Sequence, residues 1–184
     1  MANTKENKFA HIENLTSVQN LLVTVEHAGN EIPDDLGDLG LSPEDRLRHI
    51  SYDIGIKGVA LRLSSLTSFR CILSRYSRLV VDLNRPKESP ECIREESDGT
   101  KIPGNINLTL EEKVERLKKY HSPFHDLITR TLNEIKPKVL LSLHSFTPKL
   151  NEENKNREDQ ISEKIDELNQ ETDSLVEEID KWQM

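Results

Sequence analysis

The chain has 184 residues, a length that suits one domain, and a formal net charge of −8 at pH 7. Residues 1–150 carry 21 Lys and Arg against 21 Asp and Glu, so the excess negative charge lies in residues 151–184. This neutral main part argues against nucleic acid and anionic membranes as partners. The sequence lacks a membrane-length apolar run, a signal peptide and a CxxC pair, which predicts a cytoplasmic protein.

Short apolar runs alternate with helical patterns along the first half of the chain. The apolar run 21–25 predicts a buried strand, which ends in a polar loop over 26–33. Ser42 and Pro43 are typical of a helix start. A second helix is predicted over 54–66, and two further strands over 70–73 and 79–83.

Residues 86–107 are rich in Pro, Gly, Ser and charge, and predict a long loop of the kind that often carries function. Thr109 and Glu112 predict a capping box that opens a long helix, which Pro123 should kink or restart. The last predicted strand covers 139–143. This alternation predicts an α/β fold with a largely parallel sheet, whose strand ends are the expected ligand site.

The tail has a different pattern. Apolar residues alternate at spacings of four and three from 161 to 182, as in a heptad repeat. They predict either a parallel helix pair, and hence a homodimer through 161–182, or a helix that docks on its own domain. We therefore divide the chain into an α/β domain over 1–150 and an acidic amphipathic helical tail over 151–184.

Two histidines come just after predicted strands, so both should lie at the same edge of the sheet. His27 follows the strand 21–25 and His144 follows the strand 139–143. A catalytic zinc site takes about three nitrogen or oxygen ligands and leaves a position open. His27, His144 and one carboxylate, either Asp53 or Glu31, would supply such a set.

Other polar residues allow both structural and functional interpretations. Asn84 and Arg85 follow the predicted strand 79–83 and could clamp a carboxylate, or Arg85 could pair with Asp82. The spacing of four between His121 and His125 could hold a metal, although a hydrogen-bonded pair is the more common outcome. Gly104 and Asn105 are most simply a turn.

Six motifs in order resemble those of the N-formylglutamate amidohydrolase family. They are HAG at 27–29 with Pro33, YDIG at 52–55, SRLVVDLNRP at 77–86, SDGT and IPGN within 97–105, YHSPFH at 120–125, and SLHSFTP at 142–148. The resemblance covers about residues 20 to 149. It implies a zinc-dependent hydrolase with a three-layer α/β/α sandwich of the phosphorylase/hydrolase type, built on a mixed, mostly parallel sheet.

The resemblance also implies roles for particular residues and a small-molecule carboxylate as substrate. It implies His27 and His144 as metal ligands, with Asp53 as the third or Glu31 in its place. Asn84 and Arg85 would clamp the substrate carboxylate. The remaining expected substrate-site residues are Gly104 and Asn105 in the substrate loop, His121, His125 and Ser145.

The acidic tail stands where family members continue with further strands and helices, the region that supplies a glutamate base in related metallohydrolases. Glu26 and Glu31 are the candidate catalytic carboxylates in this chain, and Glu95 or Glu96 are others. Two hypotheses follow. The chain is a zinc-dependent amidohydrolase of an N-acyl amino acid such as N-formylglutamate, or it is a non-catalytic family member that binds a small molecule or oligomerises.

Overall fold

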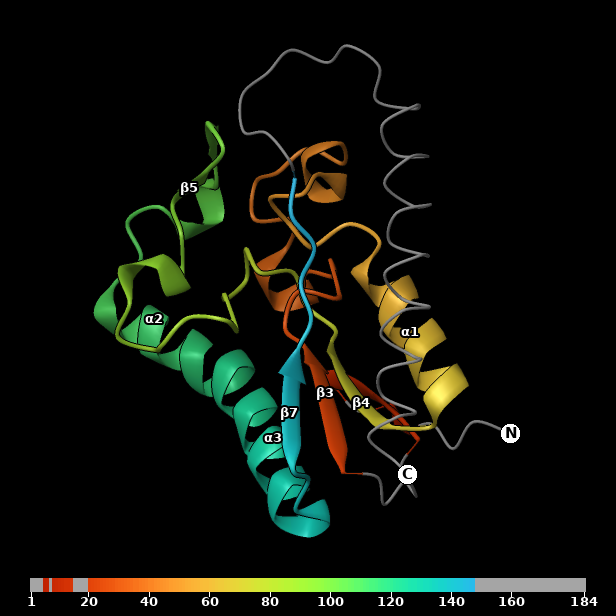
Figure 1. The fold of residues 1–184 in the computed structure, drawn as a ribbon. Coiled ribbons are helices and arrows are strands. Elements are labelled where there is room, and N and C mark those ends of the chain that lie inside the picture. Colours follow the sequence, from red (N-terminus) through yellow and green to blue (C-terminus); the bar gives the residue numbers. More distant parts are fainter. Residues whose placement is uncertain (1–4, 7, 15–19, 148–184) are drawn as a thin grey trace, which may run out of the picture.

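The structure, a computed structural model, describes residues 5–6, 8–14 and 20–147. Its centre is a mixed five-stranded sheet in the order β1-β2-β4-β3-β7 (Figure 1). Strand β3 pairs in parallel with β4 and with β7, whereas β2 pairs antiparallel with β4 and β1. The strands are β1 (Lys5–Glu6), β2 (Ala10–Glu13), β3 (Leu21–Val25), β4 (Arg70–Ser74) and β7 (Val139–Ser142).

Helices pack on both faces of this sheet, which confirms the predicted α/β character (Figure 1). Helix α1 (Ile56–Thr67) buries Ala60 and Leu63 against Val23 of β3. On the other face, α3 (Ser122–Ile135) buries Phe124 in a cluster that includes Leu22 of β3. Because alternate residues of β3 face opposite sides, one short apolar run anchors both helices.

The predicted strand over 79–83 is wrong. These residues form turns rather than a ladder, with the Val80 amide bonded to the Ser77 carbonyl at 3.0 Å and the Asp82 amide to the Cys92 carbonyl at 2.7 Å. The run is apolar because Leu79 and its neighbours are buried in the core beside α3. An apolar run of five residues can form a buried loop as readily as it can form a strand.

The helix predicted to begin at Ser42 is also wrong. The Ser42 hydroxyl does accept the Asp45 amide at 3.0 Å, but only the short 3-10 turn η2 (Asp45–Leu47) follows. A similar turn, η1 (Asp34–Leu36), precedes it. The loop over 86–107 contains four short elements, which are η3 (Pro90–Cys92), β5 (Glu96–Ser97), β6 (Thr100–Lys101) and η4 (Pro103–Asn105).

The predicted capping box is confirmed at the start of α2 (Leu110–Arg116), where Thr109 and Glu112 cap each other. A π-helical segment, η5 (Leu117–His121), joins α2 to α3. Pro123, expected to kink or restart the helix, lies in the first turn of α3, next to this wider segment.

Strand β7 forms one edge of the described sheet, and its side chains are mostly exposed. No helix in the described part of the chain is both long and apolar enough to cross a membrane. The heptad pattern over 161–182, the homodimer predicted from it and the tail domain 151–184 lie outside the described residues.

Candidate metal centre

Two histidines meet at the carboxyl ends of neighbouring parallel strands. His27 lies two residues beyond β3 and His144 two residues beyond β7. Their ring centroids are 4.9 Å apart, with an angle of 64° between the ring planes. The side-by-side pairing of β3 and β7 therefore brings together side chains that are 117 positions apart in the sequence.

Asp53 completes a cluster with both histidines. It lies just before α1, and its amide donates to the His27 carbonyl at 3.0 Å. One carboxylate oxygen is 3.4 Å from His27 Nδ1, and the other is 2.9 Å from His144 Nδ1. One potential ligand atom from each residue lies within 4.8 Å of the others. The backbone bond to His27 explains why Asp53, rather than a residue nearer in sequence, joins the pair.

His27 is fixed from its far side by Asp82. Its Nε2 donates to Asp82 Oδ1 at 2.7 Å, and the residue is only 2% exposed. Its Nδ1 is buried and has no hydrogen-bond partner among the described residues. A carboxylate on one imidazole nitrogen is the usual support for a histidine that binds a metal through the other. The unpartnered Nδ1 is therefore available as a ligand.

His144 is supported in a similar way on its Nε2 side. The Ser142 hydroxyl lies 3.1 Å from this nitrogen, and Glu26 Oε2 lies 3.6 Å from it. Glu26 itself is buried and accepts hydrogen bonds from the hydroxyls of Thr24 and Ser142, each at 2.7 Å. Its two oxygens are thus already engaged beside His144.

The acidic groups of the cluster are held in their charged forms. Burial opposes the charge of Asp53, but the hydrogen bond from His144 and the nearby His27 ring outweigh it and lower the pKa of the carboxyl. Burial also opposes the charge of Asp82, yet His27 and Arg78 lower the pKa of this carboxyl to about 2. The same carboxylates raise the pKa of His27 against the effect of its burial.

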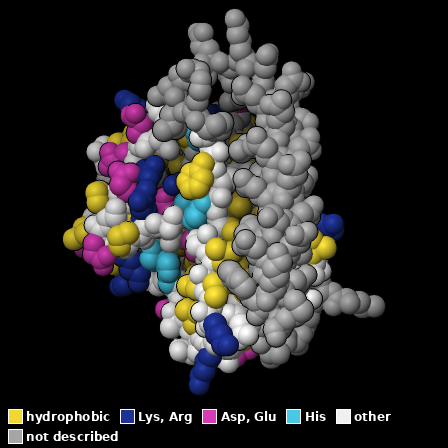
Figure 2. All heavy atoms as spheres, in the orientation of Figure 1, with side chains coloured by type: hydrophobic (Ala, Val, Ile, Leu, Met, Phe, Trp, Pro, Cys, Tyr) yellow, Lys and Arg dark blue, Asp and Glu magenta, His cyan; other side chains and the backbone are white. Residues whose placement is uncertain are grey.

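These residues fit a zinc ion. Two imidazole nitrogens and one carboxylate form a donor set that catalytic zinc sites use. The unpartnered Nδ1 of His27 and the Asp82 carboxylate behind its ring are what such a site requires. Histidine side chains also reach the surface in the middle of this face of the molecule (Figure 2).

Glu31 and Ser145 occupy different positions relative to the cluster. The structure does not bring Glu31 to it, because this exposed carboxylate forms an ion pair with Arg75 at 2.7 Å. Ser145 is adjacent to the cluster: its amide donates to Asp53 Oδ2 at 3.2 Å, and its hydroxyl donates to the Ile54 carbonyl at 2.9 Å. The Ser145 hydroxyl thus has a structural partner.

Asn84 and Arg85 follow Asp82 and are exposed. The backbone amide of Asn84 donates to Asp82 Oδ1 at 3.0 Å, so one carboxylate oxygen contacts both this loop and His27. The salt bridge considered from the sequence is absent in the described residues, since Asp82 pairs instead with Arg78 at 2.8 Å. His121 and His125 contact the same loop through its carbonyls.

Gly104 and Asn105 have structural partners. The Asn105 side chain is fully buried and donates to the carbonyls of Leu79 and Arg94 at 2.9 and 2.7 Å. A Cβ at Gly104 would lie 2.8 Å from the Leu39 Cα, so this close approach requires glycine. Their predicted role in substrate binding stays a prediction.

Gly29 has a comparable reason to be glycine. A Cβ there would lie 1.9 Å from the Arg75 carbonyl oxygen, because the loop after β3 runs against the end of β4. The Ser74 hydroxyl accepts from the Ala28 and Gly29 amides at 3.0 and 3.3 Å. Tight packing of this loop fixes the position of His27.

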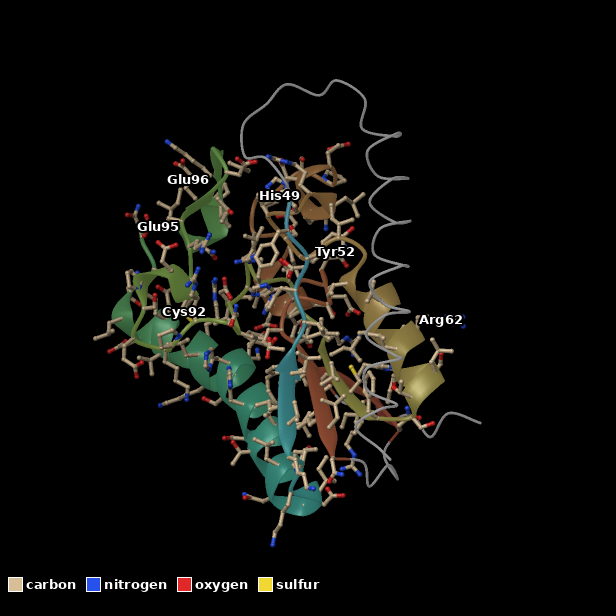
Figure 3. All side chains as sticks on the ribbon, viewed as in Figure 1. His49, Tyr52, Arg62, Cys92, Glu95 and Glu96 are labelled. Atoms are coloured by element: carbon tan, nitrogen blue, oxygen red, sulfur yellow. The ribbon has the colours of Figure 1, made fainter. Side chains whose placement is uncertain are left out.

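Sequence reasoning missed Asp82 and Arg78 as parts of the site. The available signal was a buried charge: an aspartate inside an apolar run needs a partner, and a histidine at a strand end can supply one. Glu95 and Glu96, also considered as bases, are exposed and lie on the outer part of the loop (Figure 3).

Comparison with known proteins agrees with the motifs. A family model described as N-formylglutamate amidohydrolase matches residues 19–179, beyond the 20–149 expected from the motifs. The crystal structure of gene product Atu2144 from Agrobacterium tumefaciens is similar, with a TM-score of 0.74 and 34% sequence identity. The alignment covers 81% of this chain and 61% of that one, so this chain spans about three fifths of that length. No curated protein matched. The chain belongs to the N-formylglutamate amidohydrolase family.

Proposed function

We propose that this chain is a zinc-dependent hydrolase that cleaves the amide bond of an N-acylated amino acid such as N-formylglutamate. Family membership supports the reaction class. The observation that carries the metal dependence is the convergence of His27, Asp53 and His144, whose potential ligand atoms lie within 4.8 Å of one another. The finer fold assignment, an α/β/α sandwich, is part of this proposal and is supported by helices on both faces of the sheet.

The three residues of the cluster would hold the ion through His27 Nδ1, a carboxylate oxygen of Asp53 and His144 Nδ1. Bound zinc supplies polarisation of the acyl carbonyl and a lowered pKa for an attacking water. Asp82 holds the proton of His27 on Nε2, which leaves Nδ1 unprotonated and able to bind the metal. Glu26 and Ser142 orient the His144 ring from its opposite side.

The side chain of Arg85, unpartnered among the described residues, favours a substrate that carries a carboxylate. Its guanidinium forms no hydrogen bond or ion pair with any described residue, and it lies in the loop that Asp82 ties to His27. A guanidinium binds a carboxylate through two parallel hydrogen bonds, which fixes orientation as well as affinity. Holding the substrate carboxylate at Arg85, with Asn84 beside it, would place the N-acyl end towards the histidine cluster.

A non-catalytic, ligand-binding role is the second candidate, and the carboxylates favour it. The cluster's own Asp53 and its two neighbouring carboxylates are all engaged: Asp53 with both histidines, Asp82 with His27 and Arg78, and Glu26 with two hydroxyls. None of them is free to take a proton from water. A family member that binds the substrate without turning it over would have this arrangement.

Zinc analysis paired with a hydrolysis assay separates the two candidates. We expect about one zinc per chain in the purified protein and release of formate from N-formylglutamate. The variant His144→Ala should lose both. His11→Ala is the matched control, because His11 lies on β2 and bonds to Glu13 outside the cluster. Undiminished turnover by metal-free protein would contradict the proposal, and stoichiometric zinc without turnover would favour the binding role.

A further inference from the structure

Two histidines of the long helix bind the main chain on both sides of Asn84. His121 Nε2 lies 2.9 Å from the Arg85 carbonyl oxygen, and His125 Nε2 lies 3.0 Å from the Leu83 carbonyl oxygen. A carbonyl oxygen can only accept, so both Nε2 atoms must donate. The two rings are stacked with centroids 4.3 Å apart and planes 25° apart. The pair therefore contacts the loop as one unit.

The π-helical segment explains the register of this pair. Within η5 the Ser122 amide bonds to the Leu117 carbonyl, five residues back instead of four. Pro123 has no amide hydrogen and its ring crowds the carbonyl four residues earlier, so widening the helix here relieves the conflict. His121 closes the wide segment and His125 lies one turn further along, which places both on the side of the loop.

Burial makes the His121 contact specific. The residue is only 4% exposed, and its Nδ1 is buried with no hydrogen-bond partner among the described residues. Burial also lowers the pKa of His121, with smaller contributions from His125 and Lys87, against the hydrogen bond to Arg85. The ring is thus neutral near pH 7 with its single proton on Nε2, directed at the loop.

The loop needs this support because the Arg85 side chain has no partner of its own in the described structure. The main chain around Arg85 is held by Asp82, through the Asn84 amide at 3.0 Å and the Arg85 amide at 3.2 Å, and by the two histidines. We propose that His121 and His125 are positioning residues, which hold the Asn84–Arg85 main chain so that the guanidinium meets the substrate carboxylate. This inference rests on the proposed function, and it gives the histidines a role without substrate contact.

The test compares variants that keep or remove the Nε2 donor. Leu replaces the imidazole without a donor, whereas Gln presents an N–H near the position of Nε2. For H121L and H125L we expect KM for N-formylglutamate to rise about two- to tenfold, the equivalent of one hydrogen bond. The kcat and zinc content should stay within about twofold of the wild type, and H121Q and H125Q should recover most of the KM.

Thr131→Val is the matched control. Thr131 is buried on the same helix and donates to the Leu127 carbonyl at 2.9 Å, away from the loop. An equal rise of KM in this variant would overturn the inference, because general destabilisation would explain it. A loss of kcat with unchanged KM in the Leu variants would also overturn it, since the histidines would then act in the chemistry.

Amide hydrogen exchange over residues 83–87, measured without substrate, separates this inference from the proposed function. Faster exchange in the Leu variants, but not in the Gln variants or the control, is the expected result. If the wild type turns over no substrate, the proposed function fails while this comparison still decides whether the histidines hold the loop. Unchanged exchange in both Leu variants would overturn the inference.

Discussion

Replacement of Asp82 by Asn tests the carboxylate that supports the proposed metal centre. Asp82 is fully buried and accepts hydrogen bonds from His27 at 2.7 Å, Arg78 at 2.8 Å and the Asn84 amide at 3.0 Å. Asn has nearly the same shape, but its amide carries no charge and offers only one oxygen. One end of the side chain must then turn an N–H towards His27 or Arg78, each of which is itself a donor.

Two magnitudes follow from these contacts. Loss of a carboxylate behind a metal-binding histidine commonly weakens metal affinity about 10- to 100-fold, so the zinc Kd of Asp82→Asn should rise by that factor. Loss of a hydrogen bond between charged groups costs about 1.5–3 kcal/mol, and we expect the free energy of unfolding to fall by that order. The loss should stay below that for an unpaired buried charge, because Arg78 is partly exposed and keeps access to water.

The assay is competition for zinc against a chromophoric chelator, with urea unfolding of the same preparations. Asp98→Asn is the matched control, because Asp98 pairs with Arg48 at 2.9 Å in a partly exposed position with no contact to the histidine cluster. Its zinc Kd should equal that of the wild type. A zinc Kd for Asp82→Asn within about twofold of the wild type would refute the reasoning.

Two further predictions concern the loop and the helix beside it. Arg85→Gln should raise KM about 10- to 100-fold through loss of a charge-assisted pair with the substrate, while urea unfolding changes by less than about 0.5 kcal/mol because Arg85 has no described partner. An unchanged KM would remove Arg85 from the site. The lowered pKa of His121, caused mainly by its burial, means that the unfolded chain binds a proton more readily there. Stability should therefore fall as the pH drops below about 6.5, and this part of the pH dependence should vanish in His121→Gln when unfolding is measured from pH 7 to 5. Identical pH profiles for the two proteins would contradict it.

The two histidines of the centre were within reach of the sequence because strand order and strand ends obey simple rules. His27 and His144 each follow a short apolar run, and parallel strands end at the same edge of a sheet. The third residue of the cluster could not be identified from spacing alone. Glu31 is four residues from His27, yet it forms an ion pair with Arg75. Asp53 is held beside His27 by a hydrogen bond from its backbone amide to the His27 carbonyl.

The strand β2 and the role of Asn105 escaped prediction for a related reason. Residues Ala10–Glu13 alternate apolar and polar side chains, but four residues with His11 and Glu13 form too weak a pattern. Their pairing depends on β4, which is remote in sequence. The sequence predicts a turn residue or a substrate contact at Asn105, whereas its buried hydrogen bonds to the Leu79 and Arg94 carbonyls depend on how the long loop folds back.

The wrongly predicted strand over 79–83 is informative about how this family site is built. Its apolar residues bury in the core, as they would in a strand, but turns replace the ladder and bring Asp82 under His27. The same carboxylate oxygen accepts the Asn84 amide, one residue before Arg85. A strand would have sent Asp82 to one face of the sheet and left the proposed metal centre and the proposed carboxylate clamp without a shared residue. In the observed turn both depend on one buried aspartate. We therefore expect Asp82→Asn to raise KM as well, and its effect should not add to that of Arg85→Gln, which a double-mutant cycle measures.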